Sequence, residues 1–259
     1  MIASTFSPRT IGWLALATGG VTLVGIVSIS LFYAVGGFFG PLNDVCNAVE
    51  AILSAMLAWA LYPIVRAHAP RVSRYALLAA WVGALIAVIG SGLVIFGFTG
   101  WYLAGLYTSF GYALVGLWLF SLNYAALQRG LWPRRLAQFG LLVALGMLVG
   151  FLAVPGILGR IDDPATAPWY VNLGLLGGLD RTLVIHEVSV GGLLVVEGLV
   201  AEAEGRHPHR QQDVLEADVA VAGVGGVDAL VVAADVALDI VADGVGHDFP
   251  GALETLIQR

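Results

Sequence analysis

The sequence predicts an all-α membrane protein, a polytopic bundle of about six transmembrane helices followed by an acidic tail that is poor in aromatic residues. The chain of 259 residues is 59% hydrophobic and only 12% charged, with a mean hydropathy of +0.88. This composition is too apolar for an ordinary soluble domain. Five stretches also hold the roughly 20 apolar residues that a helix needs to cross a hydrocarbon core of about 30 Å.

The five predicted spans are residues 11–35, 44–65, 75–98, 101–124 and 136–158. The first is too long for the apolar region of a signal peptide, so we interpret it as a retained anchor. A sixth predicted span, 166–179, meets Asp180 and Arg181 early. Because a charge at mid-membrane costs about 2.5–3.5 kcal/mol on insertion scales, the sixth span is either short or unusually polar.

The connections between the spans alternate in charge. Segments 66–74 and 128–135 are rich in arginine, whereas 36–41 and 97–100 carry no charge. The positive-inside rule therefore predicts that the arginine-rich turns and the N-terminus, which carries Arg9, face the cytoplasm. Aromatic residues near the span ends agree with membrane interfaces: Trp13, Tyr33, Tyr62, Trp101, Trp132 and Trp169.

The run "GYALVGLWLFSLNYAALQRGLWPRRLAQFGLLVALGMLVG", residues 111–150, combines a long span, an arginine-bearing turn and a glycine-rich fifth span. It resembles a broad group of bacterial multi-pass membrane proteins of unknown function, over about residues 11–179. The resemblance implies a bacterial plasma membrane protein and brings no catalytic residues. Gly146 and Gly150 have helix-packing spacing; we expect an intramolecular contact there, with a homo-oligomer face as the alternative.

The chain changes character near Asp180. Residues 1–179 carry a net charge of +4 and residues 180–259 a net charge of −10, and of 26 aromatic residues only Phe249 lies beyond residue 179. The sequence therefore predicts a membrane domain over 1–179 and a separate acidic tail rich in Val, Ala, Gly and Asp over 180–259.

Three interpretations of the tail remain open. It could be a soluble acidic domain, since four aspartates fall on one helical stripe: Asp228, Asp235, Asp239 and Asp243. It could be poorly ordered, because a tight core is hard to build with one aromatic residue. It could also be a reading-frame artefact, since a GC-rich gene translated in a shifted or opposite frame yields this kind of repetition.

The head of the second span is polar, which is unusual for a helix in lipid. Asn43, Asn47 and Glu50 have the spacing i, i+4, i+7, so they share one helical face, and Asp44 lies beside it. That face should point at other helices. In a structural interpretation Asn43 or Asp44 caps the helix and Glu50 bonds a neighbouring span.

In a functional interpretation the same residues form an outward-facing pocket for a cation, a proton or a small polar ligand, because an intramembrane carboxylate is often functional. The candidate ligand-binding residues are Asn43, Asp44, Asn47, Glu50, Tyr107 and Tyr112. Further candidate partners of Glu50 are Thr108, Ser109 and Asn172.

No catalytic residue is predicted. The chain contains neither HExxH nor GxSxG, and its single cysteine, Cys46, is expected to be a small apolar filler. We expect no cofactor and no metal, since "GVGG" (223–226) lacks a full dinucleotide fingerprint and "HPHR" (207–210) offers only two ligands. The expected partner is the lipid bilayer and not nucleic acid. The leading hypothesis is a non-enzymatic structural or regulatory membrane protein, then a small transporter or sensor, then a membrane enzyme.

Overall fold

The computed structural model describes residues 6–68, 70–130 and 133–177, which lie in the first of the two units into which the chain divides. Over these residues the structure contains helices and no strand, so the predicted all-α class is confirmed there. The predicted boundary near Asp180 and the interpretations of the acidic tail concern residues outside the described ranges.

Five helical segments are long and apolar enough to cross a membrane. The first four are the helices α1 (Pro8–Val35), α2 (Phe39–His68), α3 (Pro70–Ile95) and α4 (Trp101–Arg129). The fifth segment, Arg134–Leu158, comprises α5 (Arg134–Leu148), the 3₁₀ helix η1 (Val149–Ala153) and α6 (Val154–Leu158). A short helix, α7 (Trp169–Leu176), follows after a loop.

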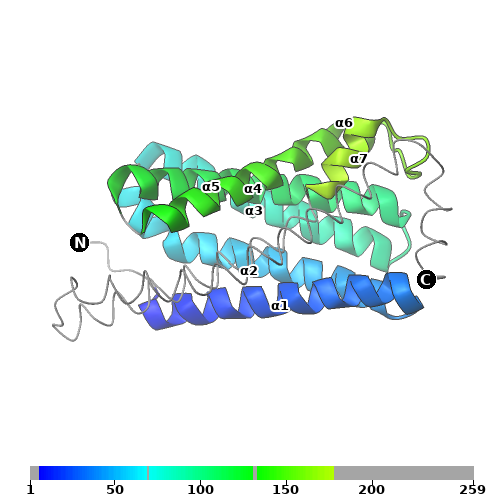
Figure 1. Cartoon of the computed structure of the whole chain (residues 1–259), viewed down its shortest axis with the longest axis horizontal. Coiled ribbons are helices and arrows are strands. Elements are labelled where there is room, and N and C mark those ends of the chain that lie inside the picture. The colour runs from blue at the N-terminus through cyan, green and yellow to red at the C-terminus, as the bar shows by residue number, and fades with distance from the viewer. Residues whose placement is uncertain (1–5, 69, 131–132, 178–259) are drawn as a thin grey trace. The chain divides into compact units, whose positions relative to one another are not determined.

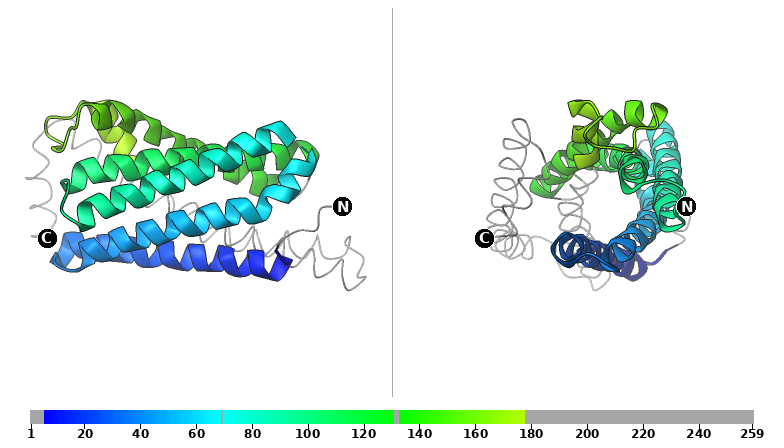
Figure 2. Two further views of the ribbon diagram at one scale, coloured as in Figure 1. Left: turned by 180° about the vertical axis from the view of Figure 1, so that it is seen from behind. Right: turned by 90° about the vertical axis from the view of Figure 1, so that its right-hand side faces the viewer.

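Each long helix packs against the next one along the chain, from α1 to α5 (Figures 1 and 2). Helix α4 is the central element, because it contacts α2, α3, α5, η1, α6 and α7. Two clusters of buried apolar residues form along α4, a large one shared mainly with α2, α3 and α5 and a small one shared with η1 and α7.

Several helices extend beyond the predicted spans, although α3 ends at Ile95, three residues before the predicted end of its span. Helix α2 begins at Phe39 instead of residue 44, α3 begins at Pro70 instead of residue 75, and α4 ends at Arg129 instead of residue 124. Hydropathy locates the apolar part of a helix, whereas backbone hydrogen bonding carries the helix on into polar residues. The arginine turns are therefore shorter than predicted.

The predicted cap of the second span is wrong. Because α2 begins at Phe39, Asn43 and Asp44 lie in its second turn, where they cannot cap the free backbone N–H groups of the first turn. Pro41 is tolerated inside the first turn since its missing N–H would have no helical partner there. The turn before α2 depends on Gly36 and Gly37, whose φ values are 72° and 69°.

The fifth span was predicted as one continuous helix, and the structure breaks it at η1. Pro155 has no N–H to donate to the carbonyl four residues earlier, which weakens helical bonding through this segment. Gly150 in η1 lies against the Ser109 carbonyl of α4, and a Cβ there would be closer to that oxygen than real Cβ atoms come. The intramolecular packing expected of Gly150 is therefore confirmed.

The loop between α6 and α7 is fastened to the start of α4 by Asp162. Its two carboxylate oxygens accept hydrogen bonds from the backbone N–H groups of Gly100 (2.6 Å) and Leu103 (3.0 Å). Gly100, at the N-cap of α4, has no side chain to do this, so a residue 62 positions away caps the helix. A carboxylate at this end also complements the helix dipole.

The predicted sixth span is described only in part. Helix α7 begins at Trp169, because Pro168 precedes it and residues 164–166 form a turn that Asp163 closes through its bond from the Ala165 N–H. Its eight residues are about 12 Å long, too short to cross a bilayer. The helix therefore starts three residues after the predicted bound of 166, and the end of the predicted span lies outside the described residues.

Small residues bring α3 and α4 close together. The buried face of α3 is a stripe without a large side chain: Ser73, Ala76, Ala80, Gly83, Ala84, Ala87, Gly90 and Ser91. A Cβ on Gly111 of α4 would lie 2.5 Å from the Gly83 carbonyl oxygen, and a Cβ on Gly90 would lie 2.7 Å from Thr108 Oγ1. This backbone approach is how transmembrane helices gain packing energy without a hydrophobic driving force.

Large apolar side chains cover the outside of the helices. Exposed positions recur along every long helix, among them Leu23, Ile52, Leu78, Leu85 and Leu142, each about half exposed or more. A water-soluble monomer rarely exposes so much contiguous apolar surface. Together with the five apolar helices, this surface indicates a membrane protein.

We expect Gly83→Ala to destabilise the protein by about 1–3 kcal/mol, because the added methyl group meets the Gly111 carbonyl and Leu114 Cβ. The control is Gly92→Ala in the same helix, where a Cβ would meet nothing within 4 Å. That variant should be unchanged or more stable. Unfolding of both variants in detergent micelles measures the difference, and equal stabilities would contradict the packing described here.

Candidate functional site

The polar stripe of α2 turns inward, as predicted. Asn47 and Glu50 are buried, with exposed fractions of 5% and 2%, and Asn43 and Asp44 are half-buried. Because α2 begins at Phe39, Glu50 lies about 16 Å along the helix from its start. The carboxylate is therefore near the middle of α2.

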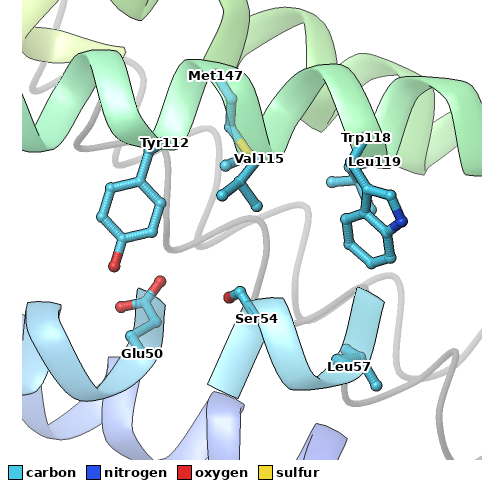
Figure 3. Close-up of a pocket in the computed structure, with 8 residues that line it drawn as sticks. All are labelled: Glu50, Ser54, Leu57, Tyr112, Val115, Trp118, Leu119 and Met147. Atoms are coloured by element: carbon cyan, nitrogen blue, oxygen red, sulfur yellow. The ribbon is translucent and has the colours of Figure 1, made fainter. Parts of the chain in front are cut away.

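A small cavity lies beside Glu50 between α2, α4 and α5. Its volume is about 10 Å³. A single water needs roughly 10–15 Å³ on this measure, so the cavity has the size of one water at most. Its lining (Figure 3) consists of Glu50, Ser54, Leu57, Tyr112, Val115, Trp118, Leu119 and Met147.

Tyr112 connects α4 to α2 at this cavity. Its side chain is 1% exposed, and its hydroxyl donates a hydrogen bond of 3.0 Å to the backbone carbonyl of Asn47. Figure 3 shows the same hydroxyl pointing toward the Glu50 carboxylate. Three of the predicted site residues, Asn47, Glu50 and Tyr112, are thus brought together by the packing of α2 against α4.

The other predicted residues lie elsewhere. The side-chain oxygen of Asn43 lies near Gly25 of α1, and Asp44 is half-buried one position further along α2. Tyr107 packs against the small apolar cluster that includes Tyr102, Leu106 and Val171. The structure therefore does not place Tyr107 or Asn43 in the lining of the cavity.

The structure gives Thr108, Ser109 and Asn172 hydrogen-bond partners other than Glu50. Thr108 bonds its own helix at the Ala104 carbonyl, and Ser109 donates to the Leu175 carbonyl of α7. Asn172 accepts a hydrogen bond from Tyr102 and donates to the Pro164 carbonyl. These bonds connect the first part of α4 with α7 and its preceding loop, and the spacing of residues along one helix does not reveal which helix is its neighbour.

Two lining residues were missed although the sequence carried a signal for them. Ser54 continues the stripe of Asn47 and Glu50 at the next i+4 position, and it is 7% exposed. Trp118 lies on the face of α4 that also presents Tyr112 and Val115. Met147 had no such signal, because its place in the lining depends on how α5 packs on α4.

Cys46 lies at the contact between α1 and α2. It is 7% exposed, and a Cβ added to Gly25 of α1 would lie 3.3 Å from its Cβ atom. Glycine at position 25 therefore fits against Cys46, and the burial of this cysteine between two helices agrees with its expected role as an apolar filler.

Comparison of the chain with models of protein families, with curated proteins and with solved structures found no match.

We expect Tyr112→Phe to destabilise the protein by about 0.6 kcal/mol and by no more than about 1.7 kcal/mol, the average and the maximum measured for interhelical hydrogen bonds in a membrane protein. The variant keeps the ring in the cavity and removes the hydroxyl, and with it the bond to the Asn47 carbonyl. Tyr124→Phe, in the same helix with a side chain 52% exposed, is the control and should leave stability unchanged. The account of this contact fails if the two variants unfold alike in micelles.

Proposed function

We propose that this chain is a non-enzymatic integral membrane protein with a structural or regulatory role. The observation that carries this proposal is the closure of the polar stripe of α2 against α4 around a cavity of about 10 Å³. The bond from Tyr112 to the Asn47 carbonyl uses a polar group to hold two helices together. A site for a substrate would need several hundred Å³.

We also propose that the protein lies in the bacterial plasma membrane with its N-terminus in the cytoplasm. Arginines at the start of α1, the α2–α3 turn, the end of α4 and the start of α5 lie at the same end of the helices (Figures 1 and 2). The carboxylates Asp162 and Asp163 lie in the loop at the opposite end. The positive-inside rule supports this orientation.

A small proton-linked transporter or sensor is the second candidate function. It is favoured by one observation, a carboxylate 2% exposed near the middle of a transmembrane helix and lining a cavity with the hydroxyls of Ser54 and Tyr112. A carboxylate beside a water-sized space has the chemistry to exchange a proton. Transport would then depend on the carboxyl group of Glu50.

The variant Glu50→Gln separates the two candidates because it keeps the size of the side chain and removes the ionisable group. The full chain is reconstituted in vesicles that contain a pH-sensitive dye, and a proton gradient is applied. For a structural role we expect no flux above protein-free vesicles with either protein, and a loss of stability of about 0.5–3 kcal/mol in the variant.

A proton or cation flux through the wild-type protein that Glu50→Gln abolishes, with the variant still folded by circular dichroism, would contradict the structural role. Tyr112→Phe is the matched control in the same assay. It alters the lining of the same cavity and leaves the carboxylate in place.

A further inference from the structure

Positive charge gathers at one end of the described helices. Seven arginines lie there: Arg9, Arg66, Arg71, Arg74, Arg129, Arg134 and Arg135. Over residues 6–177, apart from the gaps at 69 and 131–132, the four carboxylates lie elsewhere, with Glu50 buried mid-helix and Asp44, Asp162 and Asp163 toward the opposite end. Among the described residues, this end therefore carries positive charge without a nearby carboxylate.

Three of these arginines lie close together in the chain at the α2–α3 turn. Arg71 and Arg74 are exposed at i, i+3 in the first two turns of α3, so they share one face. Arg66 near the end of α2 is half-buried, and its guanidinium lies 5.8 Å from the centre of the Tyr62 ring. A cation–π contact of this kind orients the guanidinium before any anion arrives.

An aromatic pair lies two helical turns from these arginines, toward the middle of the same two helices. Trp59 of α2 and Trp81 of α3 meet edge to face with ring centres 6.0 Å apart, and they are 48% and 46% exposed. Trp59 precedes Arg66 by seven residues, and Trp81 follows Arg74 by seven. Seven residues equal two helical turns, so each tryptophan lies about 10 Å from an arginine on roughly the same helical face.

The headgroup layer of a bilayer is about 5–8 Å thick on each side, so a point about 10 Å below the phosphate level lies among the upper acyl chains. The distance of about 10 Å between arginine and tryptophan therefore places the arginines near the phosphates when the tryptophans contact the upper acyl chains. Leu78 and Leu85 extend the apolar surface along α3 beyond Arg74, and each is 60% exposed. A guanidinium head above an aromatic and aliphatic strip fits an anionic lipid better than a zwitterionic one, whose ammonium group the arginines would repel.

We propose that this α2–α3 surface, formed by Arg66, Arg71, Arg74, Trp59 and Trp81, binds an anionic phospholipid. The arginines bind the phosphate, and the tryptophan pair packs against the upper acyl chains. The inference rests on the membrane embedding in the proposed function and is independent of whether Glu50 has a structural or a transport role.

The test uses the full chain in detergent micelles, titrated with phosphatidylglycerol, with phosphatidylcholine and with inorganic phosphate, while the thermal unfolding midpoint is followed. We expect phosphatidylglycerol to raise the midpoint saturably, and the other two compounds to have little effect. Each arginine near an anionic surface contributes about five-fold in affinity, so Arg71→Gln with Arg74→Gln should weaken the apparent affinity about 25-fold.

The matched control is Arg134→Gln with Arg135→Gln, which removes the same charge at the same end of the helices but on α5. It should keep the affinity for phosphatidylglycerol. An equal loss in both double variants, or equal stabilisation by inorganic phosphate, would overturn the proposal. Circular dichroism establishes that each variant is folded, and failure of the protein to partition with membranes at all would instead contradict the proposed function.

Discussion

The structure depends on one constraint, that hydrocarbon offers no hydrogen bonds to a polypeptide. Backbone groups in the spans must then pair within helices, and polar side chains are stabilised when they find partners inside the protein. Thr18, Thr22 and Ser28 do so by donating to the carbonyl four residues earlier in α1. Asn123 of α4 donates to the Leu119 carbonyl in the same way. Polar residues can therefore populate apolar helices at low cost.

The same constraint explains how the helices are held together. Lipid tails are as apolar as leucine, so helices gain little from hiding leucine from lipid and more from close backbone packing and interhelical bonds. The stripe of small residues on α3 provides close backbone packing. Tyr112 of α4 provides an interhelical hydrogen bond to α2. Asp162 adds a polar contact at the helix ends, where a distant loop caps α4. Helix α4 takes part in all three contacts, which is why its buried face runs its whole length.

The sequence predicted the helical class and the five apolar spans because these follow from composition and length, which act within each segment. It also predicted that Asn47 and Glu50 face inward, since periodicity places residues on one side of a helix. It could not assign Thr108, Ser109 and Asn172, because their partners depend on which helices are neighbours. The break at η1 and the cap by Asp162 likewise need tertiary contacts that no local pattern contains.

The claim on which the account depends is that lipid surrounds residues 6–177 and that the arginine end faces the cytoplasm. Single cysteines test it most directly, placed in a Cys46→Ala background at two exposed positions, Thr166→Cys in the α6–α7 loop and Gln128→Cys near the end of α4. A membrane-impermeant maleimide applied to intact cells should label the first variant at once and the second only after permeabilisation. Labelling of the Gln128→Cys variant from outside, or recovery of either variant in the soluble fraction without detergent, would contradict the account.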